Sequence, residues 1–146
     1  MKVFLDSNVL VAAFATRGLC RDLLAQLILK HEPMLAEPVL VETRRVLTGK
    51  LGMPGARVER LLGRLRRYHV DRLPLDAIDV DVRDPNDVEI VRYAIACGAD
   101  VLVSGDRDLL EAVLPIRLLS PRALWQALRQ GLQPDVIHEP VAPFGR

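Results

Sequence analysis

The sequence is poor in cysteine and in aromatic residues, and it lacks a long apolar run. Its 146 residues include two cysteines, Cys20 and Cys97, which lie far apart and outside any CxxC or Cys/His cluster, so a zinc site of the usual kind is excluded. We expect both to be small core residues. No stretch approaches the roughly 18 uninterrupted apolar residues that a membrane-spanning helix needs. The charge of Asp6 also comes too early for the apolar segment of a signal peptide, and we expect a cytoplasmic protein.

An excess of either charge is also missing. Lysine and arginine together number 20 and aspartate and glutamate 19, for a formal net charge of +1, so the overall charge does not indicate a nucleic-acid partner. The distribution of charge along the chain is more informative. Residues 44–72 hold nine basic residues against two acidic ones, and residues 76–89 are then acidic.

Aliphatic residues, by contrast, are abundant. Half of the residues are hydrophobic while 4% are aromatic, and this dominance of leucine, valine and alanine suits helices packed on a parallel sheet. The length fits a single domain. We expect an α/β domain over residues 1–128 and an extended or disordered tail over residues 129–146, because the tail contains Pro134, Pro140 and Pro143 without sustained periodicity.

Apolar runs alternate along the chain with segments of helical periodicity. The runs predict short buried strands over residues 1–5, 34–36, 101–103 and 116–118. The periodicity predicts helices over residues 19–30, 39–47, 56–68, 109–113 and 124–128, the last with Ser120 as its N-cap. A further helix starts at the turn 84–87 and stops at Gly98. Residues 78–82 alternate apolar and acidic side chains, which predicts a half-exposed edge strand or an extended connector.

Four carboxylates stand where an apolar run meets a polar break: Asp6, Glu42, Asp87 and Asp106. The first and the last follow predicted strands, and the carboxyl ends of strands in an α/β fold face the crevice that binds ligands. Each aspartate taken alone is equally well explained as a helix N-cap. Several ionised carboxylates within a few ångströms repel one another unless a cation neutralises them or protons are taken up. The four together therefore favour a metal site.

The type of ligand indicates which metal. Oxygen ligands without cysteine or histidine favour Mg²⁺ or Mn²⁺ over zinc, and Mg²⁺ commonly binds carboxylates together with substrate phosphates. Metal-dependent cleavage of a phosphodiester is thus the natural reaction. Five polar residues are candidates for supporting the acids through hydrogen bonds: Ser7, Asn8, Asp84, Ser104 and Asp108. For Asp84 and Asp108, helix capping is the alternative role.

The predicted helix over residues 56–68 carries an apolar stripe beside a row of arginines. Guanidinium groups match phosphate oxygens, and a row of them can follow a nucleic-acid backbone. The alternative is the solvated face of an ordinary surface helix. On the first interpretation, the residues that contact phosphates are Arg45, Arg57, Arg60, Arg64 and Arg67.

In these motifs the chain resembles the PIN-domain family, and in particular the VapC-like toxins of bacterial and archaeal toxin-antitoxin pairs. The resemblance covers about residues 1–128 and rests on VFLDSNVL at 3–10, PVLVE at 38–42, DPND at 84–87, and GAD at 98–100 leading to SGDRDLL at 104–110. It implies a three-layer α/β/α fold with a central, mainly parallel sheet. It also implies an acidic site on the same four carboxylates, with Ser104 as its hydroxyl position.

The same resemblance implies Mg²⁺- or Mn²⁺-dependent endoribonuclease activity, usually in a homodimer bound by a small cognate antitoxin, so the expected partners are RNA and an antitoxin protein. The chain departs from the commonest toxins at its third acid. Asp87 lies in an Asp-Pro-Asn-Asp turn rather than in a Leu-Ala-Asp-Ala helix start, which resembles a less studied PIN subgroup.

Two other functions are compatible with parts of the sequence. A catalytically silent module that keeps the fold and binds RNA or an antitoxin would require one of the four acids to be lost or turned away, and none is lost. A phosphoryl-accepting receiver domain is also α/β with early acids. That domain needs a central aspartate on its third strand, where this chain has arginine and leucine.

Overall fold

A central sheet of parallel strands organises the chain. The computed structural model describes residues 1–70, 79–82 and 84–131, so the expected tail over 129–146 lies almost entirely outside the described residues. Within them the sheet has the order β2-β1-β3-β4, with every neighbouring pair parallel. The strands are β1 (Lys2–Leu5), β2 (Glu32–Met34), β3 (Val101–Val103) and β4 (Arg117–Leu119).

Helices connect the strands and cover both faces of the sheet. They are α1 (Ser7–Ala15), α2 (Leu19–Lys30), α3 (Glu37–Arg45), α4 (Gly55–Leu65), α5 (Pro85–Ala96), α6 (Arg107–Glu111) and α7 (Pro121–Arg129). The π-helix η1 (Val46–Lys50) continues α3, and the 3-10 helix η2 (Arg66–Tyr68) continues α4. None of the described helices is both long and apolar enough to cross a membrane.

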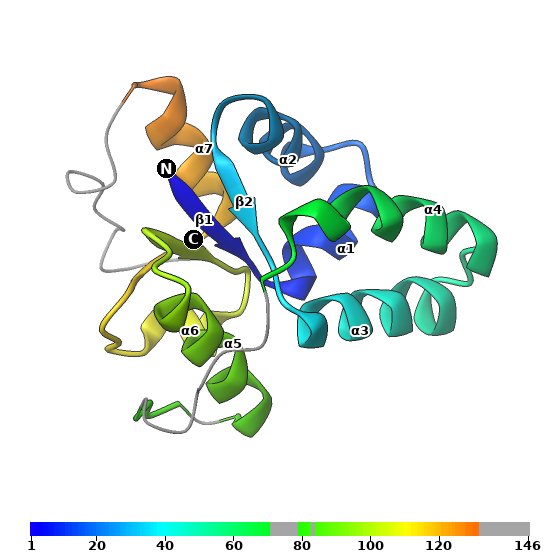
Figure 1. Cartoon of the computed structure of the whole chain (residues 1–146). Helices are drawn as coiled ribbons and strands as arrows, with labels where there is room; N and C mark the ends of the chain where they lie inside the picture. Colours follow the sequence, from blue (N-terminus) through cyan, green and yellow to red (C-terminus); the bar gives the residue numbers. More distant parts are fainter. Residues whose placement is uncertain (71–78, 83, 132–146) are drawn as a thin grey trace.

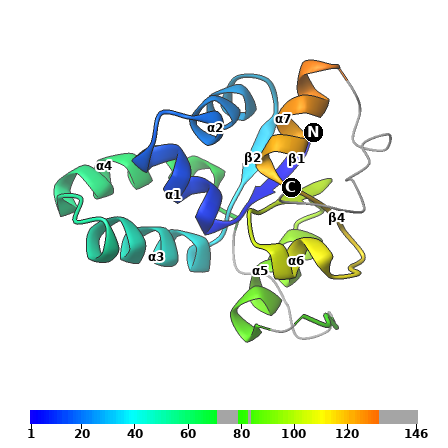
Figure 2. The ribbon, with the colours of Figure 1, turned by 180° about the vertical axis from the view of Figure 1, so that it is seen from behind.

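The molecule has three layers. Helices α2 and α7 pack together on one side of the sheet, while α5 and α6 lie on the other side (Figures 1 and 2). Helices α3 and α4 run side by side and project beyond the sheet, joined by an ion pair in which Arg44 Nε lies 2.9 Å from Glu59 Oε1. The predicted three-layer α/β/α architecture with a parallel sheet is therefore confirmed.

The two central strands are buried on both faces. Val3, Phe4 and Leu5 of β1 and all three residues of β3 have no exposed surface. Continuous burial of this kind is characteristic of parallel strands covered by helices on both sides. It explains why these strands appear in the sequence as unbroken apolar runs rather than as alternating patterns.

Side-chain caps start several helices. Asp6 accepts from the Ser7 amide at the start of α1, Asp84 from Asn86 at α5, Asp106 from Asp108 at α6, and Ser120 from Ala123 at α7. Gly98 follows the end of α5 with a φ of +75°, a left-handed conformation that glycine adopts without the cost of a side chain. Asp6 and Asp106 are therefore helix N-caps, and this role is compatible with a position at the carboxyl ends of the strands.

The boundaries of several elements differ from the sequence predictions. The strand expected over residues 34–36 begins earlier, at Glu32, and includes Pro33, which an edge strand tolerates because one side of its backbone makes no ladder hydrogen bonds. Leu35 instead forms an isolated parallel bridge with His69, at the end of η2. The helices expected over 39–47 and 56–68 end in η1 and η2, and residues 79–82 form no strand. Helix α6 and strand β4 lie one or two residues away from their expected positions.

Candidate active site

The carboxyl ends of β1 and β3 meet at the centre of the sheet. The Asp6 amide donates to the Val103 carbonyl at 3.1 Å, which continues the pairing of the two strands one residue beyond β1. The chain then leaves β1 into α1 and leaves β3 toward α6, on the opposite side of the sheet (Figure 1). Such a divergence opens the crevice in which α/β folds bind ligands.

A hydrogen-bonded group of side chains joins these two strand ends. The buried Ser104 hydroxyl donates to Asp6 Oδ2 at 2.8 Å and accepts from the Asp106 amide at 3.0 Å. Asn8 Nδ2 lies 3.2 Å from Ser104 Oγ and 3.4 Å from Asp6 Oδ2, and Asn8 Oδ1 accepts from the Gly105 amide at 2.9 Å. These bonds hold the side chains of two distant segments in one arrangement.

Asp6 is the most enclosed acid of the site, with 6% of its surface exposed. Burial raises its pKa, because the ionised form loses solvation, and the charge of Asp106 raises it further. The Ser104 hydroxyl and the Ser7 amide, whose nitrogen lies 2.7 Å from Asp6 Oδ1, act in the opposite direction. Asp6 is thus a buried carboxylate that the surrounding hydrogen bonds only partly compensate.

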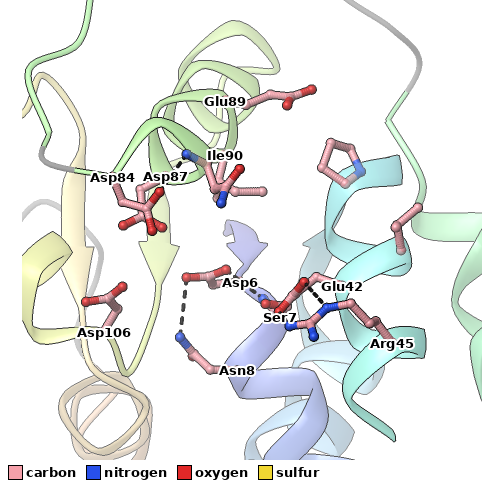
Figure 3. Close-up of a pocket in the computed structure, with 13 residues that line it drawn as sticks. Asp6, Ser7, Asn8, Glu42, Arg45, Asp84, Asp87, Glu89, Ile90 and Asp106 are labelled. Carbon is pink, nitrogen blue, oxygen red and sulfur yellow. Dashed lines mark hydrogen bonds and ion pairs between the residues drawn. The ribbon is translucent and has the colours of Figure 1, made fainter. Parts of the chain in front are cut away.

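A cavity of about 650 Å³ opens in front of these acids (Figure 3). Its walls come from α1, α3, α5 and the start of α6. All four carboxylates singled out in the sequence line it. Its lining residues are Asp6, Ser7, Asn8, Pro38, Val41, Glu42, Arg45, Asp84, Asn86, Asp87, Glu89, Ile90 and Asp106.

The first turn of α5 carries the most perturbed of these acids. Desolvation, followed by the charges of Asp106, Asp6 and Asp84, raises the pKa of Asp87 to about 7. A shift of this kind means that Asp87, which is partly desolvated and lies near other carboxylates, retains a proton near neutral pH. The cavity therefore favours an added positive charge.

Glu42 stands on the opposite wall and is paired with a neighbour on its own helix. Arg45 Nη2 donates to Glu42 Oε1 at 2.7 Å and Arg45 Nε to Glu42 Oε2 at 3.0 Å, so both oxygens are engaged. The hydrogen bond with Arg45 lowers the pKa of Glu42. Figure 3 shows this pair facing the cavity across from Asp6.

The donor set fits a hard divalent cation in its chemistry. The acids of the cavity offer only oxygen, the ligand that Mg²⁺ and Mn²⁺ prefer, and their mutual repulsion is what such an ion relieves. Within the described part of the chain, no three His, Cys, Asp or Glu side chains gather into a group that could hold a metal ion.

The supporting residues expected from the sequence divide into two groups. Ser7, Asn8 and Asp84 line the cavity, and Ser104 supports it from behind through Asp6. Asp108 lies elsewhere: it lines a smaller cavity of about 280 Å³ together with Asp81, Val82, Glu111 and Ala112.

The sequence interpretation missed several lining residues. Pro38 and Val41 share one face of α3 with Glu42 and Arg45, at helical spacing, so the position of Glu42 could have indicated them. Glu89 and Ile90 follow the acidic turn on α5. Glu89 extends away from the other acids, as Figure 3 shows.

The arginine row lies outside the lining of this cavity, on a helix that packs against α3. Arg57, Arg60 and Arg64 are exposed on α4, whose Val58, Leu62 and Leu65 are buried, as the amphipathic pattern predicts. Arg67 is exposed in η2, with its guanidinium carbon 5.5 Å from the centre of the Tyr68 ring. Of the five arginines singled out, Arg45 lines the cavity, and the other four, on α4 and η2, do not.

Comparison with known proteins assigns the chain to a family. A sequence model of the PIN domain matches residues 2–108, which is most of the chain. The chain belongs to the PIN domain family. By sequence, no curated protein gives a significant match to this PIN domain.

Solved structures share the fold of this PIN domain. One is the crystal structure of VapBC2 from Rickettsia felis bound to a DNA fragment from its promoter. A chain of that structure matches with a TM-score of 0.61 at 16% identity, and the match covers 82% of this chain and 98% of that one. VapBC-1 from nontypeable Haemophilus influenzae contains a chain that matches with a TM-score of 0.59 at 14% identity, covering 84% and 99%. At these identities the likeness demonstrates the fold alone.

Proposed function

We propose that this PIN domain is a divalent-metal-dependent endoribonuclease. The observation that carries the proposal is the cavity at the carboxyl ends of β1 and β3, which is lined by Asp6, Glu42, Asp87 and Asp106. Burial and the charges of neighbouring carboxylates together raise the pKa of Asp87 to about 7, and this supports a site for a cation. Membership of a family whose toxin members are typically nucleases supports the reaction.

In this proposal the four carboxylates hold Mg²⁺ or Mn²⁺. The bound ion supplies Lewis-acid activation of water and neutralises charge on the phosphate oxygens. The contribution of the chain itself is placement. Ser104 and the Ser7 amide fix both oxygens of Asp6, and the Asp108 amide, 2.9 Å from Asp106 Oδ1, orients Asp106. Asp87 holds a proton on its carboxyl group near neutral pH and releases it when positive charge enters the cavity.

The exposed arginines of α4 support RNA as the substrate. Arg57, Arg60 and Arg64 stand one turn apart on the solvent face of a helix packed against α3, the helix that carries Glu42. Arginine forks bind phosphate oxygens, and each phosphate contact adds affinity that salt reduces. We propose that this row, with Arg67, binds the RNA backbone outside the cavity, and that Arg45 contacts it at the mouth.

The partner is proposed to be a small antitoxin. Two solved structures that share the fold are VapBC assemblies, one of them bound to promoter DNA. By this likeness, the chain is the toxin of a toxin-antitoxin pair in the cytoplasm, and it forms a homodimer that the antitoxin binds. Co-expression with the product of an adjacent small reading frame, followed by size-exclusion chromatography with light scattering, tests both the complex and its stoichiometry.

A silent RNA-binding or antitoxin-binding module is the alternative. One observation favours it: among the described residues no three acidic, histidine or cysteine side chains form a group that could hold a metal ion, and Glu42 is engaged by Arg45. Such a module would bind RNA without cleaving it, whatever metal is present.

Incubation of the purified protein with a mixture of RNAs separates the two functions. Cleavage is expected with Mn²⁺ or Mg²⁺ and not with EDTA, and Asp6→Asn is expected to lose it by at least about 100-fold while the far-UV circular dichroism stays unchanged. Asp22→Asn removes an exposed acid from the first turn of α2 and serves as the matched control. Full cleavage by Asp6→Asn would refute the proposed site. Binding without cleavage under every metal condition would establish the silent module.

A further inference from the structure

The ion pair between Arg45 and Glu42 forms part of the cavity lining. Both residues line the cavity, three positions apart on α3, and the guanidinium engages both carboxylate oxygens. Among the described lining residues, Arg45 is the one basic side chain facing several acids. The only positive charge of the wall is therefore already committed to one of the proposed metal ligands.

A guanidinium and a divalent cation compete for the negative charge of the same carboxylate. Arginine uses two N–H groups to bind a carboxylate in this bidentate manner, and a metal ligated by Glu42 would need at least one of the two oxygens. The acids on the far wall, Asp6, Asp87 and Asp106, have no such competitor among the lining residues. Glu42 is thus the acid at which a metal would meet a cation that is already bound.

We infer that Arg45 is a positioning residue that competes with the metal ion for Glu42: it holds the carboxylate on the α3 wall when no metal is bound and releases it when a metal enters. This inference rests on the proposed function, because it concerns the same site. It concerns Glu42 alone among the four proposed metal ligands that line the cavity, because Glu42 is the one that Arg45 binds.

The pair is suited to release because it is weak. The side chains of Arg45 and Glu42 are 57% and 44% exposed, and exposed pairs within one helix contribute little to stability. A pair buried away from water would hold Glu42 too firmly for a metal to displace it. The competition should accordingly change the affinity for a metal by about threefold to tenfold rather than by orders of magnitude.

Mn²⁺ binding to the full chain, measured by isothermal titration calorimetry, tests the inference without any need for cleavage. The proteins are the wild type, Arg45→Gln, Glu42→Gln and the double variant, with Arg44→Gln as the matched control. Arg44 precedes Arg45 on α3, but its ion pair is with Glu59 of α4, and it does not line the cavity. The control thus removes the same charge, one residue away, from an ion pair of the same type.

Arg45→Gln is expected to bind Mn²⁺ about threefold to tenfold more tightly than the wild type, and Arg44→Gln to bind like the wild type. In the Glu42→Gln background the effect of Arg45→Gln should vanish, because the contested carboxylate is gone. If the effect persists there, or if Arg44→Gln produces it equally, general charge is the cause and the inference is wrong. If neither the wild type nor Arg45→Gln binds Mn²⁺ saturably, the proposed metal site itself fails and the inference falls with it.

A second measurement observes the release directly. The side-chain Nε–H resonances of the arginines, recorded by ¹H–¹⁵N NMR, are assigned through the Arg45→Gln and Arg44→Gln variants. Titration with diamagnetic Mg²⁺ should shift the Arg45 signal as its hydrogen bond to Glu42 Oε2 is lost, and leave the Arg44 signal in place. An Arg45 signal that stays unchanged at saturating Mg²⁺ would show that the pair survives metal binding and would overturn the inference.

Discussion

The hydroxyl of Ser104 donates a 2.8 Å hydrogen bond to Oδ2 of Asp6, across 98 positions of sequence. Both residues follow directly on neighbouring parallel strands, so the register of β1 against β3, with Leu5 opposite Val103, brings them together. Ser104 is fully buried and also accepts from the Asp106 amide. One small side chain therefore sets the relative position of two of the proposed ligands.

Replacement of this hydroxyl should weaken both the fold and the site. Ser104→Ala leaves Asp6 Oδ2 with only the 3.4 Å contact from Asn8 and is expected to lower the free energy of unfolding by about 1–3 kcal/mol. It should also weaken Mn²⁺ binding by about tenfold, because the ligand loses its orienting partner. Chemical denaturation and calorimetry measure the two effects.

Ser120→Ala is the control for that substitution. Ser120 caps α7 through the Ala123 amide and does not line the cavity, so its loss should cost about 1 kcal/mol of stability with no change in Mn²⁺ affinity. Equal Mn²⁺ affinities for wild type and Ser104→Ala would contradict an orienting role for the hydroxyl.

The stability of the metal-free protein should fall as pH rises from about 4 to above 7. Desolvation, with Asp106, Asp6 and Asp84, raises the pKa of Asp87 to about 7, so over this window the folded state holds a proton that the unfolded state has lost. The raised pKa of Asp6 acts in the same direction. Urea denaturation between pH 4 and pH 8.5 in EDTA, with Asp87→Asn beside the wild type, measures the effect.

Asp87→Asn should be more stable than the wild type above pH 7, and the difference should shrink toward pH 4, where the carboxyl is protonated in the folded state and begins to be protonated in the unfolded state. Glu89→Gln removes a carboxylate from the same helix whose side chain extends away from the other acids, and it should not reproduce this pH-dependent difference. A constant difference between Asp87→Asn and the wild type at all pH values would show that Asp87 does not titrate in this window.

Divalent metal should stabilise the fold at alkaline pH. Mn²⁺ at ten times its dissociation constant contributes about 1.4 kcal/mol, or roughly 4–6 °C in melting temperature for a chain of this size. The Asp6→Asn, Asp106→Asn double variant should show little of this shift, because two proposed ligands are neutral. Differential scanning fluorimetry at pH 8, with and without EDTA, makes the comparison. An equal shift in the double variant would place the bound Mn²⁺ outside the cavity.

RNA binding should depend on α4 through charge. Arg60→Ala combined with Arg64→Ala removes two exposed guanidinium groups and should weaken RNA binding. The slope of log K against the logarithm of the salt concentration should become shallower by about 1.4. Arg21→Ala combined with Arg122→Ala removes two exposed arginines from α2 and α7 and should leave the slope unchanged. Fluorescence anisotropy with a non-cleavable RNA over a series of salt concentrations provides the slopes. Identical slopes for all three proteins would identify α4 as an ordinary solvated helix.

Sequence by itself determined the local elements of this protein and the order in which they occur. Unbroken apolar runs predicted the buried strands β1 and β3, helical spacing predicted α2 and α4, and the Asp-Pro-Asn-Asp turn predicted the start of α5. These signals are local, since a strand buried on both faces and an amphipathic helix each leave a pattern within a few residues. The family resemblance, which rests on short motifs in a fixed order, was likewise readable from the chain and is confirmed by the PIN domain match.

Only the tertiary structure decided how the acids relate to one another. The parallel register of β1 and β3 placed Ser104 beside Asp6, and the packing of α3 and α5 around one cavity gave Glu42 and Asp87 their opposite positions. The sequence could show that Glu42 and Arg45 stand one helical turn apart, but not that this turn faces the cavity. Charges separated by tens of residues interact through distances that depend on every intervening connection, so their pKa values and pairings belong to the folded molecule and not to any segment of it.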